Sequence, residues 1–370
     1  ELGGCKFRRA NPTIENCSGG FAQYYYLRNP QFIFKIPDEI NNATAAPINC
    51  ALAQVMEAFH IAKPRFGDNV VIQGAGGLGI NAAAIASDMG ANKVIVIDGQ
   101  RYSEAWGDST HQYIPYFSNE IAAFGVVNTE FYNNGITLTV PGFTAITTGV
   151  YKEIKNAGEE LPRYPSIFQY LIKKDSISNE SAWIINSKDK LAVLGNCQES
   201  DWEDKHIPLS DCGIDGLGSG YRHDTLTLAR FFNVMSEYHP KLTLLGFREP
   251  DISGHTNSWE DYLQEIKNTD EYIYRVWNYI QNDSFYAGTT TLFITNDHGR
   301  HLDGVGDGFQ SHGDECEGCR HINFFAFGPD FKKGVIDIRR EQIDIPATIA
   351  EILQLNPEYI EGEIMYELFE

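Results

Sequence analysis

The segment Lys93-Val94-Ile95-Val96-Ile97-Asp98-Gly99 predicts a buried β-strand that stops at an acidic residue. An unbroken run of Val and Ile is typical of a strand whose two faces are both covered, as in a parallel sheet. The Asp-Gly pair then favours a turn. We therefore expect an α/β fold, with residues 93–98 as a central strand of a mostly parallel sheet flanked by helices.

A glycine-rich loop precedes this strand. Residues 70–73 predict another buried strand, and Gly74-Ala75-Gly76-Gly77-Leu78-Gly79 follows it and opens an Ala-rich helix. Together with 93–98 this forms a βαβ unit that fits a dinucleotide-binding fingerprint. Gly74 would make the tight turn, Gly76 would admit a pyrophosphate, Gly79 would let the helix pack, and Asp98 would hold a ribose hydroxyl. The alternative is a loop retained for packing alone.

Residues 1–98 resemble the zinc-containing medium-chain alcohol dehydrogenase family in 19–24, 45–50 and the glycine loop. The resemblance implies NAD(P) as cofactor and places Cys50 where that family has a catalytic zinc ligand. The other catalytic ligands are missing, and the further βα units of a cofactor domain do not follow Asp98. We interpret 1–92 as a partial dehydrogenase-like segment, with short strands at 20–40 and a helix at 51–63. The junction between this segment and the rest of the chain could be natural, engineered or an artefact of sequence assembly, and the sequence fits all three.

Downstream of this strand, acidic and histidine residues recur where predicted strands end. In an open α/β sheet the carboxyl ends of the strands line one crevice, so we expect these side chains to converge. The set comprises Asp98, Asp251, His255, Asp297, His298 and His312. Six such donors are too many for one catalytic metal with an open position, and they suit two metals about 4 Å apart. Mixed imidazole and carboxylate ligation predicts Zn²⁺, with Mn²⁺ or Fe as alternatives. His301 and His321 are rivals for the role of His312.

A threonine before a predicted helix is the candidate nucleophile. Pro141 suits the first turn of a helix, so Thr139 would lie just before the helix begins. A metal could lower the pKa of its hydroxyl, and the backbone N–H of Val140 would favour an anion there. Thr137 and Thr144 are the alternatives.

The order of these motifs resembles the alkaline phosphatase superfamily, in particular its phosphodiesterase and nucleotide-pyrophosphatase-like members. The family's T-x-P-x-x-x-x-x-x-T-G pattern matches Thr139, Pro141, Thr148 and Gly149, and residues 342–350 resemble its last helix. The resemblance covers 93–370 and implies an α/β/α sandwich. It assigns one metal to Asp98, Thr139, Asp297 and His298, and the other metal to Asp251, His255 and His312.

The resemblance implies a metal-dependent hydrolase of phosphate monoesters or diesters that acts through a phosphothreonine. Gly142-Phe143 stand where many members have a side chain that contacts the phosphate. No C/S-x-P-x-R motif occurs at the nucleophile, which disfavours a sulfatase that uses formylglycine. We expect residues 151–240 to form a cap or a surface insertion. A truncated NAD(P)-dependent dehydrogenase and an inactive fusion are the alternative functions.

Charge and cysteine content limit the partners. The net charge of −21, without a Lys/Arg cluster, excludes a nucleic-acid surface and requires metal cations at any phosphate site. No apolar run is long enough to span a bilayer, and no signal peptide is visible; the family resemblance implies a periplasmic or extracellular protein. Cys197 and Cys212 could pair. Cys316-Glu317-Gly318-Cys319 is a single C-x-x-C pair, and without a second one it predicts a local disulfide or free thiols.

Overall fold

The computed structural model describes residues 52–62, 78, 82, 91–174, 178–329 and 331–369. The chain divides into two compact units, residues 1–62 with 72–85 and residues 63–71 with 86–370. In the first unit, α3 (Ala53–Ala62) confirms the helix expected at 51–63. The predicted strands at 20–40 and 70–73, Cys50, and the loop glycines Gly74, Gly76 and Gly79 lie outside the described residues, so the cofactor-binding interpretation stays a prediction.

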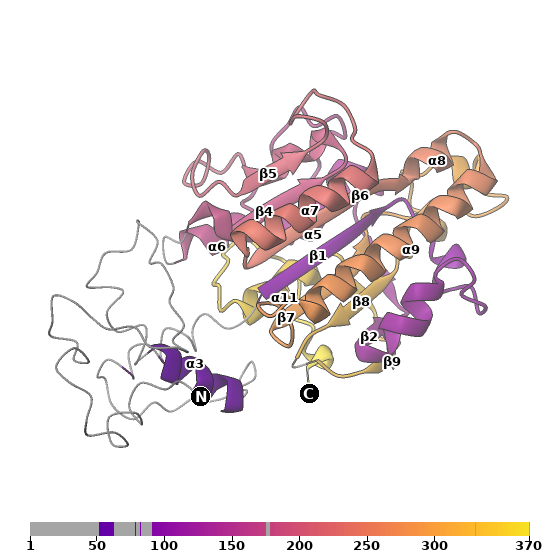
Figure 1. Cartoon of the computed structure of the whole chain (residues 1–370). Helices are drawn as coiled ribbons and strands as arrows, with labels where there is room; N and C mark the ends of the chain where they lie inside the picture. Colours follow the sequence, from indigo (N-terminus) through magenta and orange to yellow (C-terminus); the bar gives the residue numbers. More distant parts are fainter. Residues whose placement is uncertain are drawn as a thin grey trace, which may run out of the picture. The chain divides into compact units, whose positions relative to one another are not determined.

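The second unit contains an eight-stranded sheet (Figure 1). Its order is β5 (Leu209–Cys212), β4 (Ala182–Asn186), β6 (Leu242–Pro250), β1 (Ala91–Asp98), β7 (Thr290–Asn296), β8 (Phe324–Phe327), β2 (Val126–Asn128) and β9 (Gly334–Ile336). The first five strands are parallel, and β8 runs antiparallel to both β7 and β2. β3 (Phe131–Tyr132) pairs with β10 (Arg340–Glu341) in a separate small sheet. The prediction that 93–98 forms a central strand of a mostly parallel sheet is confirmed.

Helices cover both faces of the large sheet because successive strand residues point to opposite sides. Val94 and Val96 of β1 join one core with α5 (Thr139–Thr148), α6 (Ile167–Lys173) and α11 (Asp344–Ile352). Ile95 and Ile97 join the other core with α7 (Asp224–Tyr238) and α9 (Trp259–Asn282). The result is the expected α/β/α sandwich, and α11 confirms the closing helix. Figure 1 shows α7 and α9 lying along the same side of the sheet.

The remaining helices are short. They are η2 (Tyr102–Glu104), η3 (Phe117–Ile121), η4 (Ala122–Phe124), η5 (Asn179–Ser181), η6 (Asp189–Gly195), α8 (Asp251–His255), η7 (Gly308–Gln310), α10 (Glu317–Arg320) and η8 (Tyr366–Leu368). Among the described residues no helix is both long and apolar enough to cross a membrane.

The prediction of a cap over residues 151–240 does not describe this part of the fold. The range supplies β4 and β5 to the central sheet, and its helices α6 and α7 cover opposite faces of that sheet. Ile184 and Ile185 of β4 are completely buried. The apolar runs of this range are therefore strands and helices of the core. The loops between them made the range resemble an insertion in the sequence.

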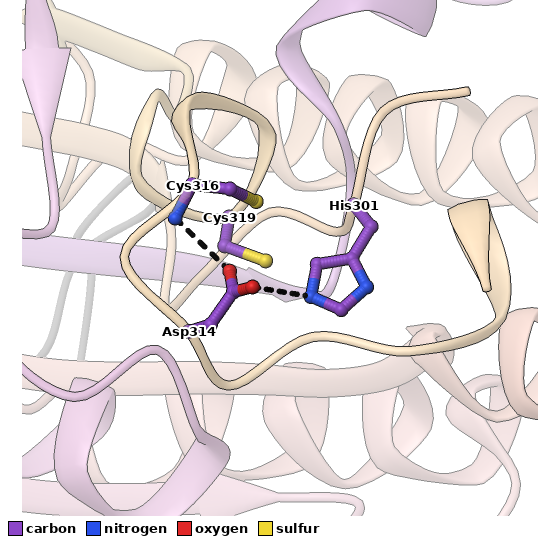
Figure 2. Close-up of side chains that lie close together, drawn as sticks. All are labelled: His301, Asp314, Cys316 and Cys319. Carbon is purple, nitrogen blue, oxygen red and sulfur yellow. Dashed lines mark hydrogen bonds and ion pairs between the residues drawn. The ribbon is translucent and has the colours of Figure 1, made fainter. Parts of the chain in front are cut away.

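Cys197, Cys212, Cys316 and Cys319 are all free. The prediction that Cys197 pairs with Cys212 is wrong: the Cys212 thiol lies against the backbone carbonyl of Ile184, inside the sheet. Cys316 is the N-cap of α10 and Cys319 lies within this helix, close to His301 and Asp314 (Figure 2).

Lys93 is a lysine whose side chain is buried although it belongs to the central strand β1. Its side chain is 1% exposed, and Nζ donates to the Pro240 carbonyl at 2.5 Å and to Thr243 Oγ1 at 3.2 Å. Burial lowers the pKa of Lys93 well below its ordinary value, because an ammonium group loses its hydration in the sheet.

We expect the stability advantage of the wild type over Lys93→Met to grow as the pH rises toward about 10.4, the ordinary lysine pKa. In that range the unfolded chain binds a proton at Lys93 that the folded chain does not, so raising the pH favours folding, by up to about 1.4 kcal/mol per pH unit. Urea unfolding of both proteins at several pH values measures this difference. A difference that stays constant between neutral pH and pH 10 would show that folding leaves the pKa of Lys93 unchanged.

Candidate metal centre

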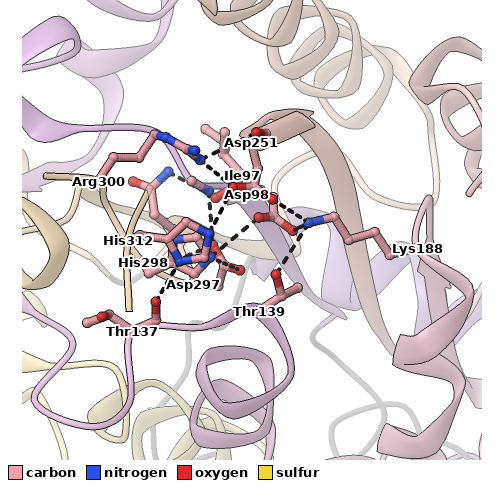
Figure 3. Close-up of polar contacts among 12 residues, drawn as sticks. Ile97, Asp98, Thr137, Thr139, Lys188, Asp251, Asp297, His298, Arg300 and His312 are labelled. Atoms are coloured by element: carbon pink, nitrogen blue, oxygen red, sulfur yellow. Dashed lines mark hydrogen bonds and ion pairs between the residues drawn. The ribbon is translucent and has the colours of Figure 1, made fainter. Parts of the chain in front are cut away.

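Strand register brings three carboxylates together at one edge of the sheet. Asp98 ends β1, Asp251 follows β6 directly as the first residue of α8, and Asp297 follows β7. β1 pairs with both neighbours up to this edge, with Asp98 opposite Pro250 and Ile97 opposite Asn296. All three Asp side chains are buried, and they converge as shown in Figure 3.

Gly99 lets β1 turn away directly behind the first carboxylate. Its φ is +66°, in the left-handed region, and a Cβ there would lie 2.8 Å from Asp251 Oδ1. Its N–H donates to Asp297 Oδ1 at 3.2 Å. The Asp98-Gly99 pair thus permits the close approach of all three acids.

Thr139 is the first residue of α5, with Leu138 as the N-cap, so the helix begins at Thr139 and not after it. Its Oγ1 lies 3.3 Å from Lys188 Nζ and faces the carboxylates (Figure 3). The N–H of Val140 donates to Asn156 Oδ1 at 2.8 Å. The expectation that this N–H would be available to an anion is therefore wrong, because a side chain already occupies it.

The first group of metal-type donors comprises Asp98, Asp297 and His298, whose ligand atoms lie within 4.8 Å of one another. His298 Nε2 is 3.6 Å from Asp98 Oδ1 and 3.3 Å from Asp297 Oδ2. These three atoms are buried and have no hydrogen-bond partner. Buried acceptors without a partner are costly, and a cation placed among them would remove that cost.

The second group surrounds Asp251 Oδ1. His255 Nε2 and His312 Nε2 each lie 3.3 Å from this oxygen and 3.1 Å from each other. His298 stacks on His312 with ring centroids 3.8 Å apart and so borders both groups. His312 Nδ1 is bound to the Thr137 carbonyl at 2.8 Å, which leaves Nε2 facing the site.

The rival histidines lie elsewhere. His321 stacks on Tyr102 and Tyr132, and His301 contacts Asp314. The structure therefore brings Asp98, Asp251, His255, Asp297, His298 and His312 together with Thr139, as the sequence predicts.

Two buried cations of the site are absent from the sequence prediction. Lys188 Nζ lies 2.7 Å from Asp98 Oδ2 and 2.7 Å from Asp251 Oδ2, while the Arg300 guanidinium contacts Asp251 Oδ1. Lys188 follows the end of β4, the same kind of position that identified the acids, so a search of strand ends that included basic residues would have found it. Arg300 follows Asp297-His298-Gly299 directly.

The buried charges alter one another's pKa values. Burial raises the pKa of Asp98 to about 7 although Lys188 opposes this, and burial together with Asp98 raises that of Asp297 well above its ordinary value. Burial would also raise the pKa of Asp251, but Lys188, His255 and His312 hold it well below its usual range. Burial and the neighbouring His312 lower the pKa of His298, which leaves a neutral imidazole with a free lone pair. Neutral imidazole and ionised carboxylate are the forms that bind metals, so His298 and Asp251 are already in that form, whereas the raised pKa values of Asp98 and Asp297 mean that a bound cation would displace protons there.

The sulfatase family model matches residues 94–355, a range that begins inside β1 and includes most of the second unit. The chain belongs to the sulfatase family. This family is part of the alkaline phosphatase-like superfamily, whose members use divalent metal ions and typically act on small-molecule esters.

Solved structures that resemble the chain share its fold at low sequence identity. The phosphonate monoester hydrolase from Silicibacter pomeroyi is 14% identical with a TM-score of 0.55, covering 74% of this chain and 76% of its own. Murine ectonucleotide pyrophosphatase/phosphodiesterase 5 is 14% identical with a TM-score of 0.54, covering 76% of this chain and 100% of its own.

Curated relatives match a shorter stretch and agree with the dehydrogenase resemblance. An L-threonine 3-dehydrogenase from Pseudoalteromonas atlantica is 40% identical over 91 residues, 24% of this chain and 25% of the relative. The chain thus spans about a quarter of that relative's length.

Gly142→Ala tests the close contact between α5 and the candidate metal centre. A Cβ at Gly142 would lie 2.5 Å from the Asp297 carbonyl oxygen, so backbone must shift. We expect a loss of about 1–3 kcal/mol of stability together with weaker metal binding. Denaturant unfolding and metal titration measure the two effects.

Gly195→Ala is the matched control, because its Cβ would meet only Pro208 at 3.6 Å, an ordinary contact. Equal stability losses for the two variants would contradict the assignment of the Gly142 effect to this contact.

Proposed function

We propose that the chain is a metal-dependent hydrolase of phosphate esters that uses Thr139 as its nucleophile. The observation that supports this is the threonine hydroxyl, which lies 3.3 Å from the buried Lys188 Nζ at a site that also contains two groups of metal-type donors, Asp98 with Asp297 and His298, and Asp251 with His298 and His312. The family supports an ester hydrolase, and the choice of phosphate rests on the residues of this site.

The residues present fit two divalent cations. The partnerless atoms of Asp98, Asp297 and His298, with Thr139, would hold one ion. Asp251, His255 and His312, with mutual distances of 3.1–3.3 Å, would hold the other. Nitrogen and oxygen donors of this kind suit Zn²⁺, with Mn²⁺ as the alternative. Such ions neutralise charge on a phosphoryl group and lower the pKa of a hydroxyl group.

The chemistry of the chain's own residues centres on Thr139 Oγ. This oxygen attacks phosphorus in line with the departing ester oxygen, so an O–P bond to Thr139 forms as the bond to the leaving alcohol breaks. Water then attacks the phosphothreonine, releases phosphate and restores the hydroxyl. Lys188 Nζ, 3.3 Å from Thr139 Oγ1, supplies positive charge where the phosphoryl oxygens gather.

Phosphate is favoured over sulfate by the residues around the nucleophile. At the positions of C/S-x-P-x-R the chain has Thr139, Pro141 and Phe143, so the Cys or Ser that would become formylglycine is missing. Phe143 replaces the Arg of that motif and is completely buried in the core. A dehydrogenase role for Asp98 is disfavoured, because its carboxylate faces Lys188 and His298.

Thr139→Ala should abolish turnover of an aryl phosphate ester, lowering kcat by roughly 10³-fold or more, because the attacking oxygen is removed. Thr144→Ala is the matched control, since this hydroxyl lies in the same helix, is buried and has no hydrogen-bond partner. Steady-state rates and mass spectrometry of quenched turnover reactions measure the loss of activity and of phosphothreonine.

The same assay tests the metal requirement. A chelator should remove the activity, and Zn²⁺ or Mn²⁺ should restore it. Full activity in Thr139→Ala, or activity that ignores the chelator, would refute the mechanism, and faster hydrolysis of the matching aryl sulfate would refute the choice of phosphate.

Lys188→Met should reduce kcat/KM for a phosphate monoester by about 10–100-fold, the effect of losing one charge-assisted hydrogen bond. The effect on a diester should be smaller, because a diester carries one negative charge fewer. Comparing the two substrates separates the loss of this charge interaction from general damage to the site. Lys155→Met, at an exposed lysine, controls for the loss of one positive charge. If kcat/KM fell equally for both substrates, Lys188 would not be interacting with the negative charge of the substrate.

A further inference from the structure

The segment between β7 and β8 carries two histidines of the metal centre on a chain with little regular structure. Only η7 and α10 interrupt residues 297–323. His298 lies at the start of this segment and His312 in its middle. A loop of this length needs other constraints if it is to hold two ligands in place.

Four side chains from the two ends of this segment gather beside α10. They are His301, Asp314, Cys316 and Cys319, and one ligand atom from each lies within 4.8 Å of the others (Figure 2). None of them belongs to the candidate catalytic groups. Cys319 and His301 are buried, and Cys316 is partly buried.

The facing atoms of the four side chains lie close to one another. His301 Nε2 is 3.1 Å from Asp314 Oδ2, yet this nitrogen is buried and has no partner of hydrogen-bond geometry. Ligand atoms at 2.0–2.1 Å from a tetrahedral Zn²⁺ lie about 3.3 Å apart, close to this spacing. The nitrogen is therefore positioned to share a central atom with the carboxylate.

The outer atoms of the same side chains are held by neighbours. His301 Nδ1 lies 3.2 Å from Ser311 Oγ and 3.4 Å from Asp307 Oδ1. A hydrogen on Nδ1 would leave the Nε2 lone pair free, the arrangement common for metal-bound histidines. Asp314 Oδ1 accepts from the N–H of Cys316 at 3.0 Å, which leaves Oδ2 facing His301.

We propose that His301, Asp314, Cys316 and Cys319 form a structural Zn²⁺ site, separate from the candidate catalytic centre. Two thiolates, an imidazole and a carboxylate are a donor set that suits tetrahedral Zn²⁺. Four protein ligands fill the coordination sphere and leave no position for substrate. A histidine and an aspartate of the same loop would supply the two ligands that a second C-x-x-C pair provides in a four-cysteine zinc site.

The bound ion would clamp the segment at its two ends. Two backbone hydrogen bonds already connect the early and late parts of this segment. The N–H of Gly299 donates to the Cys319 carbonyl at 2.8 Å, and the N–H of His301 donates to the Ser311 carbonyl at 3.1 Å. His312 lies between the clamped residues, so the site would fix the position from which its imidazole reaches Asp251. The inference does not depend on which ester the catalytic centre cleaves.

Cobalt substitution of the whole 370-residue chain tests this site separately from the catalytic one. Co²⁺ bound to thiolates absorbs strongly in the near ultraviolet, and the proposed catalytic ligands include no cysteine. We expect this band in the wild type and in Thr139→Ala, and its loss in the double variant Cys316→Ser/Cys319→Ser. Elemental analysis should show one equivalent of zinc fewer in that double variant.

Cys197→Ser/Cys212→Ser is the matched control and should keep both the band and the zinc. The measurement on the wild type remains decisive if the double variant fails to fold. The absence of the band from Co²⁺-loaded wild type would overturn the proposal. A Cys316–Cys319 disulfide, detected by mass spectrometry as the loss of two hydrogens from their peptide, would overturn it as well.

Discussion

Three carboxylates buried side by side are the constraint to which the rest of the site responds. Asp98, Asp251 and Asp297 cannot all be ionised at such proximity without nearby positive charge, because the sheet edge excludes most of the water that would screen them. Lys188 and Arg300 supply part of that charge, and both reach the site from segments that follow strand ends. Even the backbone is held: the Asp297 carbonyl accepts from Asn133 and Gln342, residues far apart in the chain.

The central sheet and the acids were predictable because both depend on local patterns. A Val/Ile run that ends in Asp98 has one plausible environment, and parallel strands place Asp251 and Asp297 beside it once β6 and β7 flank β1. Positions near strand ends also indicated His255 and His312, but their assignment to one proposed metal rested on the family resemblance, since spacing alone does not distinguish His312 from His301 or His321.

Features that depend on tertiary contacts could not be obtained in this way. Asn156 reaches the Val140 N–H from a loop whose path the sequence does not specify. Residues 151–240 contain two short strands, β4 and β5, whose place in the central sheet depends on tertiary contacts, so the range resembled an insertion. The pairing of His301 with the C-x-x-C segment likewise requires the loop to fold back on itself, which residue spacing does not reveal.

The position of β1 at the middle of the sheet also matters during synthesis. β1 ends at Asp98, but its partner β6 begins at Leu242 and β7 at Thr290, so both neighbours are translated much later. At ~5–20 residues per second, the strand waits roughly 8–30 s for its first partner. An exposed Val94-Ile95-Val96-Ile97 run is the kind of segment that aggregates, and a charged residue stands at each end of it. Lys93 and Asp98 stand where flanking charges oppose such aggregation, before either becomes buried.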